Sequence, residues 1–400
     1  MTTPIVHSCI YCLEPNPLEE PTLEHVIPRF LGGDNAPPQF QITNVCKRCN
    51  SNLGLFVDAA FERSWHVAMG LRLSELAHYN PDNPVALPLL CMGQPKDLVL
   101  PGQTDDEVCE QWLAPLGEIV FLVRPKDERL HWYSGGNPIT MKQKKTRAYF
   151  FVSARTPLAP ELTKRAFAAA FEKYKVKRVL ATTEEAGFFG KDIGFDEADE
   201  LDQSRFQYLI SNAIVAGGSR NGFSLDIHFD RRFLCKLALG FAYVLFGEAA
   251  LNTAYAKELK KGMWHRGDGD FPEVAGSDAW ENQDPIFNKA MGLPYATTLC
   301  VMPSPDGVAL SLHIGTNRSW IIKCASVEGI PVEKLNALSE GRVFVCSKHI
   351  TQPIEMSLLE YMAHKTQGGF HPELTRIEEQ TALNAEYLAG LGLRDTNIGH

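Results

Sequence analysis

The sequence predicts an α+β fold in which a small, loop-rich N-terminal module precedes a larger mixed α/β region of unassigned topology. Three observations predict it. Residues 1–54 hold seven prolines and two Cys-x-x-Cys pairs, a helical pattern follows, and strand and helix patterns then interleave to the end. The length of 400 residues suits two or three domains. We expect a division into 1–80 and 81–400, with a further subdivision near 184–203.

The hydrophobic and charge patterns predict the elements in order. A helix is expected from about Leu55 to His78, ending at the breaker cluster 80–84. Strands are then expected at 85–92, 118–123, 148–153 and 178–182, a helix at 160–175, and an acid-rich connector at 184–202. In the last section we expect a strand at 223–229, a helical run at 231–260, strands near 297–302, 308–314, 318–325 and 342–347, and a polar helix at 372–390.

The composition is that of a globular chain, with 44% hydrophobic and 22% charged residues. The N-terminus has neither the basic region nor the apolar region of an export signal. The longest apolar run, Phe233–Leu251, is interrupted by Lys236, Gly240, Gly247 and Glu248, so it predicts buried helices rather than a membrane span. We therefore expect a cytoplasmic protein with no membrane partner.

The cysteines predict a metal site. Cys9–Cys12 and Cys46–Cys49 are two Cys-x-x-Cys pairs with 33 residues between them. Two such pairs complete a tetrahedral thiolate site for structural Zn²⁺. A segment with so many breakers buries little apolar surface, and zinc would contribute folding free energy of about 10 kcal/mol. The other six cysteines are isolated and are expected in the core.

The residues between the pairs carry a family resemblance. The motif Glu24-His25-Val-Ile-Pro28 is followed by Leu31-Gly32-Gly33, by Asn44, and by Asn50 directly after the last cysteine. This order resembles the HNH nuclease family, of the kind with a four-cysteine zinc site. The resemblance covers roughly residues 7–60, and nearly every motif position in that stretch is filled.

The same residues suit phosphodiester hydrolysis on chemical grounds. The reaction needs an activated water and a cation that neutralises charge at phosphorus and at the leaving oxygen. His25 is suited to act as the general base. Glu24 and Asn50 offer hard oxygen ligands, which suit Mg²⁺ or Mn²⁺ as the catalytic ion.

The resemblance implies a β-hairpin followed by a helix around the catalytic ion. His25 and Glu24 would lie on the first strand, Asn44 would orient the His25 imidazole, and Asn50 would complete the ligands from the helix. Asp58, about two helical turns after Asn50, is a secondary candidate ligand. Many relatives carry a basic residue where this chain has Leu53, which removes one expected phosphate contact.

One segment is strongly basic although the chain carries a net charge of −9. Residues 141–180 contain eleven Lys and Arg against two Glu. Such a stretch could follow a phosphate backbone, or it could be a solvated helix face that balances the acidic connector after it. The candidate nucleic-acid contacts are Lys142, Lys144, Lys145, Arg147, Lys164 and Arg165. The acidic total favours an enzyme that is recruited or switched on.

Two smaller patterns leave alternatives open. Asp226, His228 and Asp230 alternate, which would place them on one face of the strand expected at 223–229, as a second metal site or as a polar strand face. The loop Trp264–Asp270 has the composition of a ligand-binding turn or of an ordinary turn.

The leading hypothesis is a metal-dependent HNH endonuclease, with DNA favoured over RNA as its substrate. A small HNH module joined to a large partner region resembles prokaryotic restriction and antiviral defence effectors, by architecture alone. An activating ligand or protein partner would then act through the C-terminal region, and an oligomer is left open. The alternatives are a non-catalytic zinc-ribbon scaffold and a nuclease subunit of a larger guided complex.

Overall fold

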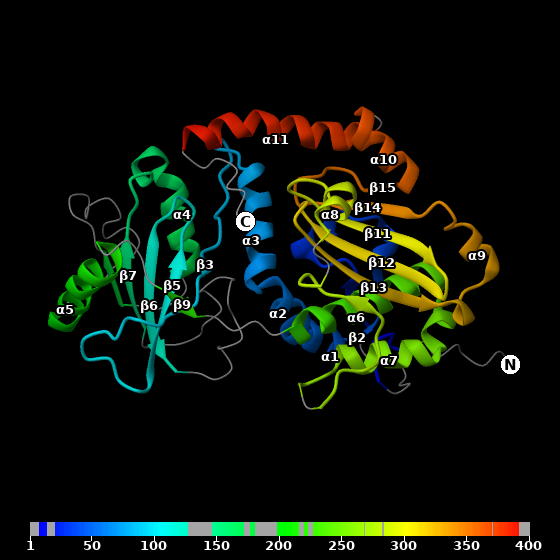
Figure 1. Ribbon diagram of the computed structural model, residues 1–400, viewed down its shortest axis with the longest axis horizontal. Coiled ribbons are helices and arrows are strands. Elements are labelled where there is room, and N and C mark those ends of the chain that lie inside the picture. The colour runs from blue at the N-terminus through cyan, green and yellow to red at the C-terminus, as the bar shows by residue number, and fades with distance from the viewer. Residues whose placement is uncertain are drawn as a thin grey trace. The chain divides into compact units, whose positions relative to one another are not determined.

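The computed structural model describes residues 8–13, 21–126, 146–171, 177–180, 198–215, 220–222, 227–267, 269–281, 284–369 and 371–391. Its helices and strands confirm the mixed α+β class (Figure 1). None of the described helices is both long enough and apolar enough to cross a membrane.

The chain folds into two compact units that are each discontinuous in sequence. Unit 1 combines Met1–Glu62 with Asp226–Thr381, and unit 2 combines Arg63–Leu225 with Ala382–His400. The boundary therefore falls before the breaker cluster at residues 80–84, where the sequence suggested a division. The expected functional division, a nuclease module in 1–80 and a regulatory region in 81–400, stays a prediction.

Unit 1 begins with a hairpin and a helix. Strand β1 (Pro21–His25) pairs antiparallel with β2 (Gln41–Cys46), and three short 3₁₀ turns lie between them. Helix α1 (Lys47–Leu53) follows directly and continues through a π-helical turn (Gly54–Asp58) into α2 (Ala59–Glu62).

The second half of unit 1 is a six-stranded antiparallel sheet with helices. The strands lie in the order β10-β13-β12-β11-β14-β15. Their bounds are β10 Gly276–Ser277, β11 Thr297–Ser304, β12 Gly307–Ile314, β13 Arg318–Ser326, β14 Arg342–Cys346 and β15 Ile354–Ser357. The helices are α6 Ile227–Phe246, α7 Ala254–Met263, α8 Pro285–Met291, α9 Val332–Asn336, α10 Leu358–Gln367 and α11 Pro372–Gly390, whose last residues belong to unit 2.

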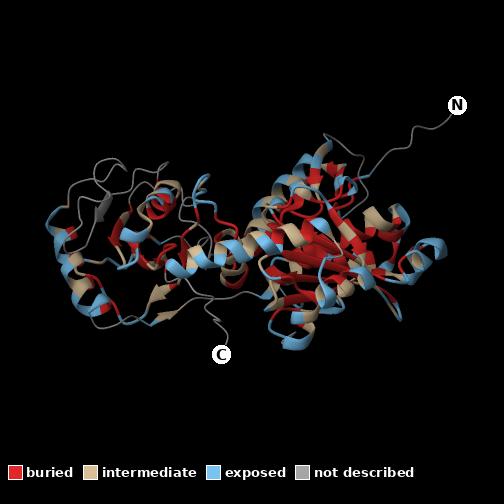
Figure 2. Ribbon diagram, turned by 90° about the horizontal axis from the view of Figure 1, so that it is seen from above, coloured by how far each residue is buried: buried red, intermediate tan, exposed pale blue. Residues whose placement is uncertain are grey.

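Helix α6 is the element that joins the two halves of unit 1. It packs on β13 and on α2, and thirteen of its twenty residues are buried (Figure 2). Phe233 stacks on Phe61 of α2 with ring centroids 4.0 Å apart, and Phe241 lies 4.7 Å from Phe40. The N-terminal hairpin thus shares one hydrophobic core with residues that come more than half the chain later.

Unit 2 is a five-stranded sheet with a helix on each face. The strand order is β3-β5-β6-β7-β8, in which β7 and β8 are parallel and the other pairs antiparallel. The bounds are α3 Trp65–Ala77, β3 Leu90–Cys91, β4 Gln94–Pro95, β5 Glu107–Leu113, β6 Ile119–Pro125, β7 Arg147–Phe151, α4 Pro160–Phe171, β8 Lys177–Leu180, α5 Glu200–Leu209 and β9 Asn221–Gly222. Helix α4 packs on one face through Phe167 and Phe171, and α5 packs on the other through Leu209.

The strand expected at 223–229 is wrong where the structure describes it. Residues 223–226 lie outside the described residues, and α6 begins at Ile227. His228 and Asp230 are therefore two residues apart on a helix, and they point in different directions rather than sharing a strand face. Asp230 is buried and accepts a hydrogen bond from Trp320 Nε1 at 2.7 Å. The apolar run that follows has helical spacing, and its helix extends back over the alternating polar residues that had predicted a strand.

The close approach of α6 to the hairpin depends on one glycine. A Cβ at Gly240 would lie 2.5 Å from Val26 Cγ1 and 3.0 Å from the Tyr11 hydroxyl oxygen. We expect Gly240→Ala to lower the free energy of unfolding by about 1–3 kcal/mol, because the helix must move away from the hairpin. Chemical denaturation followed by tryptophan fluorescence measures this.

Gly54→Ala is the matched control, since a Cβ there would meet nothing within 4 Å and the backbone is right-handed helical. Equal unfolding midpoints for the two variants would contradict the tight contact between α6 and the hairpin.

Candidate active site

The N-terminal hairpin sets the directions of the two central candidate residues. Glu24 lies opposite Ile42 and His25 opposite Gln41, and the register shifts between Thr22 and Glu24. Such irregularities re-aim side chains and are common near active sites. Glu24 is buried at 4% exposure, whereas His25 is half-buried. The order of hairpin and then helix is the arrangement that the family resemblance implies.

The four N-terminal cysteines form a metal-binding cluster. Their Sγ atoms all lie within 4.8 Å of one another, and no disulfide joins them. Cys12 Sγ lies 3.6 Å from Cys49 Sγ and 3.9 Å from Cys46 Sγ. Four thiolates around one Zn²⁺ at a bond length of about 2.3 Å would be about 3.8 Å apart. The cluster therefore fits a structural zinc ion.

Helix α7 supports this cluster from the second half of unit 1. Trp264, at the end of α7, donates its indole N–H to the carbonyl of Tyr11, between the first two cysteines, at 2.9 Å. Burial lowers the pKa of Lys260 on α7, while the thiolates of Cys9, Cys12 and Cys49 act in the opposite direction. A cation thus lies where it can offset the negative charge of a tetrathiolate site.

His25 contacts a carboxylate that sequence reasoning missed. Its Nε2 lies 3.2 Å from Asp34 Oδ1, and Arg29 Nε lies 3.1 Å from the same oxygen. Burial and then the Arg29 charge hold the pKa of His25 below its usual value of 6.5, against a smaller upward influence of Asp34. The imidazole is therefore neutral near pH 7, which is the state that a general base requires.

The Leu-Gly-Gly motif explains how Asp34 returns to His25. Gly32 has φ +92°, and a Cβ there would lie 2.5 Å from the backbone nitrogen of Ser347. A Cβ at Gly33 would lie 1.7 Å from the carbonyl oxygen of Ile27. Only glycine allows so tight a turn against its own strand and against the end of β14. The acidic residue directly after the two glycines was the sequence signal for this contact.

Glu24 pairs with a buried lysine from α6. Lys236 Nζ lies 2.9 Å from Glu24 Oε1 and 2.5 Å from Asp58 Oδ2, and Lys236 is only 2% exposed. Burial lowers the pKa of Lys236, but the two carboxylates outweigh it and the net shift is upward. The Tyr11 hydroxyl also donates to Glu24 Oε1, at 3.5 Å. Asp58 therefore binds an ammonium through Oδ2, and its Oδ1 is buried without a recorded partner.

The two asparagines of the motif each connect segments of the N-terminal region, Asn50 through its side chain and Asn44 through its main-chain carbonyl. Asn50 donates from Nδ2 to Thr22 Oγ1 at 3.0 Å and to the Leu23 carbonyl at 2.9 Å, which fastens α1 to β1. The carbonyl of Asn44 accepts a hydrogen bond from Ile10 N at 3.0 Å and so holds the first cysteine turn. The expected role of the Asn44 side chain in orienting His25 stays a prediction.

Two side-chain oxygens of the motif are the candidates for holding a divalent ion. In the part of the chain that the structure describes, the hydrogen bonds and ion pairs of Glu24 use Oε1 and those of Asn50 use Nδ2, so Glu24 Oε2 and Asn50 Oδ1 are the candidate ligand oxygens, and their binding of an ion stays a prediction. Among the described residues, the four cysteines are the one group of three or more His, Cys, Asp or Glu near enough to share an ion. Two protein oxygens with water and phosphate completing the shell is the usual arrangement for Mg²⁺.

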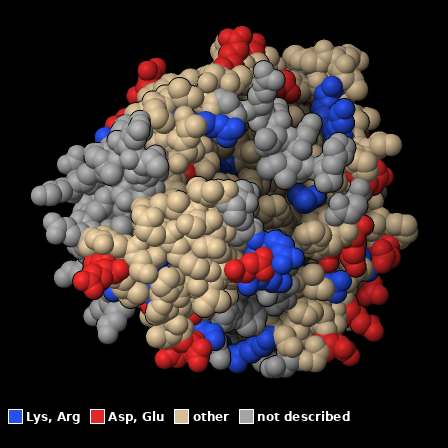
Figure 3. Space-filling model, turned by 60° about the vertical axis from the view of Figure 1, so that its left-hand side comes forward, with Lys and Arg blue, Asp and Glu red and all other residues tan. Residues whose placement is uncertain are grey.

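The expected nucleic-acid contacts are only partly described. Lys142, Lys144 and Lys145 lie outside the described residues. Arg147 pairs with Asp199 at 3.0 Å and with Asp202 at 2.5 Å, and Lys164 lies 3.4 Å from Glu161. Arg165 is exposed. On the face drawn in Figure 3, both basic and acidic side chains are scattered among residues of other kinds. Nucleic-acid binding by this segment stays a prediction.

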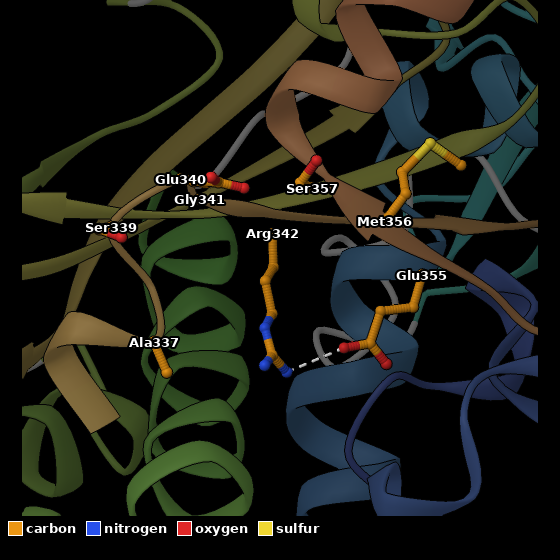
Figure 4. Close-up of a pocket in the computed structure, with 8 residues that line it drawn as sticks. All are labelled: Ala337, Ser339, Glu340, Gly341, Arg342, Glu355, Met356 and Ser357. Carbon is orange, nitrogen blue, oxygen red and sulfur yellow. Dashed lines mark hydrogen bonds and ion pairs between the residues drawn. The ribbon is translucent and has the colours of Figure 1, made fainter. Parts of the chain in front are cut away.

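An open pocket of about 450 Å³ in unit 1 is lined by the turn after α9, by the start of β14 and by β15 (Figure 4). Arg342 points across it to Glu355, with Nη1 2.9 Å from Oε1, and Gln39 donates to Oε2 of the same carboxylate at 3.0 Å. Because Glu355 neutralises Arg342, the pocket offers no free cation for a phosphate. Its bonds instead tie the hairpin region to the sheet.

The zinc assignment predicts a specific effect of Cys46→Ala. We expect elemental analysis to find about one zinc per chain in the wild type and much less than one in the variant. Loss of the ion should also lower the melting temperature, because metal binding and folding of such a module are coupled. Cys324→Ala, which removes a buried cysteine of the sheet, should retain its zinc. A folded Cys46→Ala protein with unchanged melting would contradict the structural role.

Comparison with known proteins agrees with this site. Residues 9–66 match the family model described as HNH endonuclease. No curated protein and no solved structure matched the chain. The matched range includes the four cysteines, the strand that carries Glu24 and His25, and helix α1 with Asn50. Residues 9–66 are thus an HNH module with a four-cysteine cluster that could hold a metal ion.

Proposed function

We propose that the protein is a metal-dependent endonuclease that hydrolyses phosphodiester bonds of nucleic acid, with DNA favoured over RNA. The observation that carries the proposal is the environment of His25, a half-buried imidazole with a lowered pKa on the strand that also carries Glu24. A neutral histidine next to a hard oxygen ligand is the pairing that this hydrolysis needs.

His25 would remove the proton from the attacking water. The contact with Asp34 favours the tautomer that carries its proton on Nε2, so that Nδ1 is the acceptor. Asp34 would also stabilise the imidazolium that forms, as a carboxylate does when it holds a catalytic histidine. Asp34 is therefore a positioning residue for His25.

Glu24 and Asn50 would hold the Mg²⁺ or Mn²⁺ ion through Glu24 Oε2 and Asn50 Oδ1, the oxygens that do not take part in their hydrogen bonds and ion pairs with other described residues. When bound, such an ion supplies charge neutralisation at phosphorus and at the leaving oxygen. Asn50 fixes the start of α1 against β1, so both ligands belong to one rigid hairpin and helix. Asp58 is less suited, because its Oδ2 already binds Lys236.

One observation favours a second candidate, a non-catalytic zinc-ribbon scaffold. The Glu24 carboxylate is almost fully buried and paired with Lys236, as in a structural ion pair. A scaffold needs such a pair for its fold but has no use for a histidine with a lowered pKa at the surface of the hairpin. Measurements of cleavage and of divalent-ion binding separate the two candidates.

The biological role that we propose is a prokaryotic restriction or antiviral defence effector in the cytoplasm. Two features support this role. A small nuclease module is joined to a large additional region. The acidic net charge of −9 favours recruitment of the enzyme to its substrate over indiscriminate binding to nucleic acid. Residues 226–381 fold with the nuclease module, so the separate unit built on 63–225 is the better candidate for the part that receives an activating ligand or a protein partner.

The His25→Ala variant tests the catalytic proposal. We expect the wild type to cleave plasmid DNA with Mg²⁺ or Mn²⁺, and the variant to lose about 10²–10⁴-fold in rate, because the general base is removed. Single-stranded DNA and RNA are assayed in parallel to define the substrate. Phage plating on cells that express either form extends the comparison to the defence role.

His371→Ala is the matched control, because His371 is also half-buried with a lowered pKa but lies at the start of α11. If wild type and His25→Ala are equally inactive on every substrate, with candidate activators present, the nuclease proposal is wrong and the scaffold is favoured.

The pH dependence tests the contact between His25 and Asp34. Because a general base must be neutral and the pKa of His25 is lowered, we expect kcat/KM to fall only as the pH drops through a midpoint below 6.5. Asp34→Asn removes an upward influence on that pKa, so its midpoint should lie lower still, with a reduced plateau. Asp306→Asn, which removes another exposed aspartate paired with a cation, should leave the profile unchanged. A midpoint that rises in Asp34→Asn would refute this role.

A further inference from the structure

Lys236 is an unusual residue for its position. It lies in the middle of α6, where its neighbours Cys235 and Leu237 are fully buried, and its own exposure is 2%. A lysine is almost never buried to this extent without a partner. Lys236 lies 178 residues after Asp58, and it is the one charged residue of α6 between Phe233 and Phe246, so this apolar part of the helix carries a charge into the N-terminal module.

Lys236 and Tyr11 both contact the same oxygen of Glu24. Lys236 Nζ lies 2.9 Å from Glu24 Oε1, and the Tyr11 hydroxyl donates to the same oxygen at 3.5 Å. The ammonium also lies 6.0 Å from the centroid of the Tyr11 ring, which is itself fully buried. Lys236 is held from its other side by Asp58 Oδ2 at 2.5 Å. The carboxylate of Glu24 is thus fixed in rotation by donors on one side only.

We propose that Lys236 is a positioning residue of the nuclease site, which holds Glu24 by Oε1 so that Oε2 is presented to the divalent ion. The inference rests on the proposed function, since it concerns Glu24 as a ligand. Residues outside the first shell that bind metal ligands fix their orientation, and their loss commonly weakens metal binding by about 10–100-fold. Helix α6 then completes the nuclease module chemically as well as sterically.

Lys236→Met alone is a poor test, because it leaves two buried carboxylates without a counter-charge. The double variant Lys236→Met with Asp58→Asn removes one positive and one negative charge, so the local net charge is unchanged. The second double variant, Lys236→Gln with Asp58→Asn, has the same charge but retains an N–H donor for Glu24 Oε1. The two differ mainly in that donor.

The readout is the affinity of the full-length protein for Mn²⁺, measured from the electron paramagnetic resonance signal of the free ion. Zinc content of about one per chain and a cooperative melting transition report correct folding. We expect the Met double variant to bind Mn²⁺ about 10–100-fold more weakly than wild type and the Gln double variant to recover most of the loss. Arg342→Met with Glu355→Gln, which removes another ion pair of unit 1, should leave the affinity unchanged.

The possible outcomes are distinct. Equal Mn²⁺ affinities in the wild type and in both folded double variants would mean that Lys236 serves only the fold. Tighter Mn²⁺ binding in the Lys236→Met double variant would mean that the ammonium competes with the ion. Either result overturns the inference but leaves the nuclease proposal standing. A wild type that binds no Mn²⁺ overturns both the inference and the proposed catalytic ion. If the Lys236→Met double variant loses its zinc, the Lys236→Gln double variant alone tests the inference. Its affinity for Mn²⁺ must then lie within a few-fold of the wild-type affinity for the inference to stand.

Discussion

The structure depends on a constraint of size: a segment of some sixty residues rich in breakers cannot bury a sufficient core by itself. Two devices meet this constraint. The cysteine cluster would crosslink the loop-rich part through a bound metal, and α6 supplies the apolar surface that the hairpin and α2 lack. Phe61, for example, stacks on Phe233 of α6 and meets Trp320 of β13 edge to face, with centroids 5.2 Å apart. The hairpin is therefore one layer of a larger core.

This packing explains why polar groups of the site can be buried. A buried carboxylate is costly without a partner, and Glu24 meets the ammonium of Lys236 in the interior. His25, one residue further along the strand, has the opposite environment. It is half-buried and contacts the exposed Asp34, which also pairs with Arg29. Adjacent residues of one strand thus have different environments, one in the interior beside Lys236 and one beside an exposed carboxylate.

The sequence was most informative where the determinants are local. The two Cys-x-x-Cys pairs and the strands from Thr297 to Cys346 follow from spacing and alternation within short windows. The hairpin was expected from the family resemblance, and the family model confirms the module. Asp34 and Lys236 were not predicted, because their partners are brought to them by a turn and by packing between distant segments. Strand β5 was missed since buried Glu110, which pairs with Arg124, disguises its alternation. Lys236 and Gly240 were noticed only as interruptions of an apolar run, although both are contact points with the hairpin.

The discontinuity of unit 1 has a consequence for the order of events during synthesis. The ribosome completes the Glu24-His25 motif early, but residues 63–225, the larger part of unit 2, are synthesised before α6. At about 5–20 residues per second, this interval is on the order of ten seconds or more. Until then the hairpin lacks the surface on which it packs and the cation that neutralises Glu24. A nascent chain therefore carries the Glu24-His25 motif before the core on which it packs exists, so the proposed site would be assembled only after α6 has been synthesised.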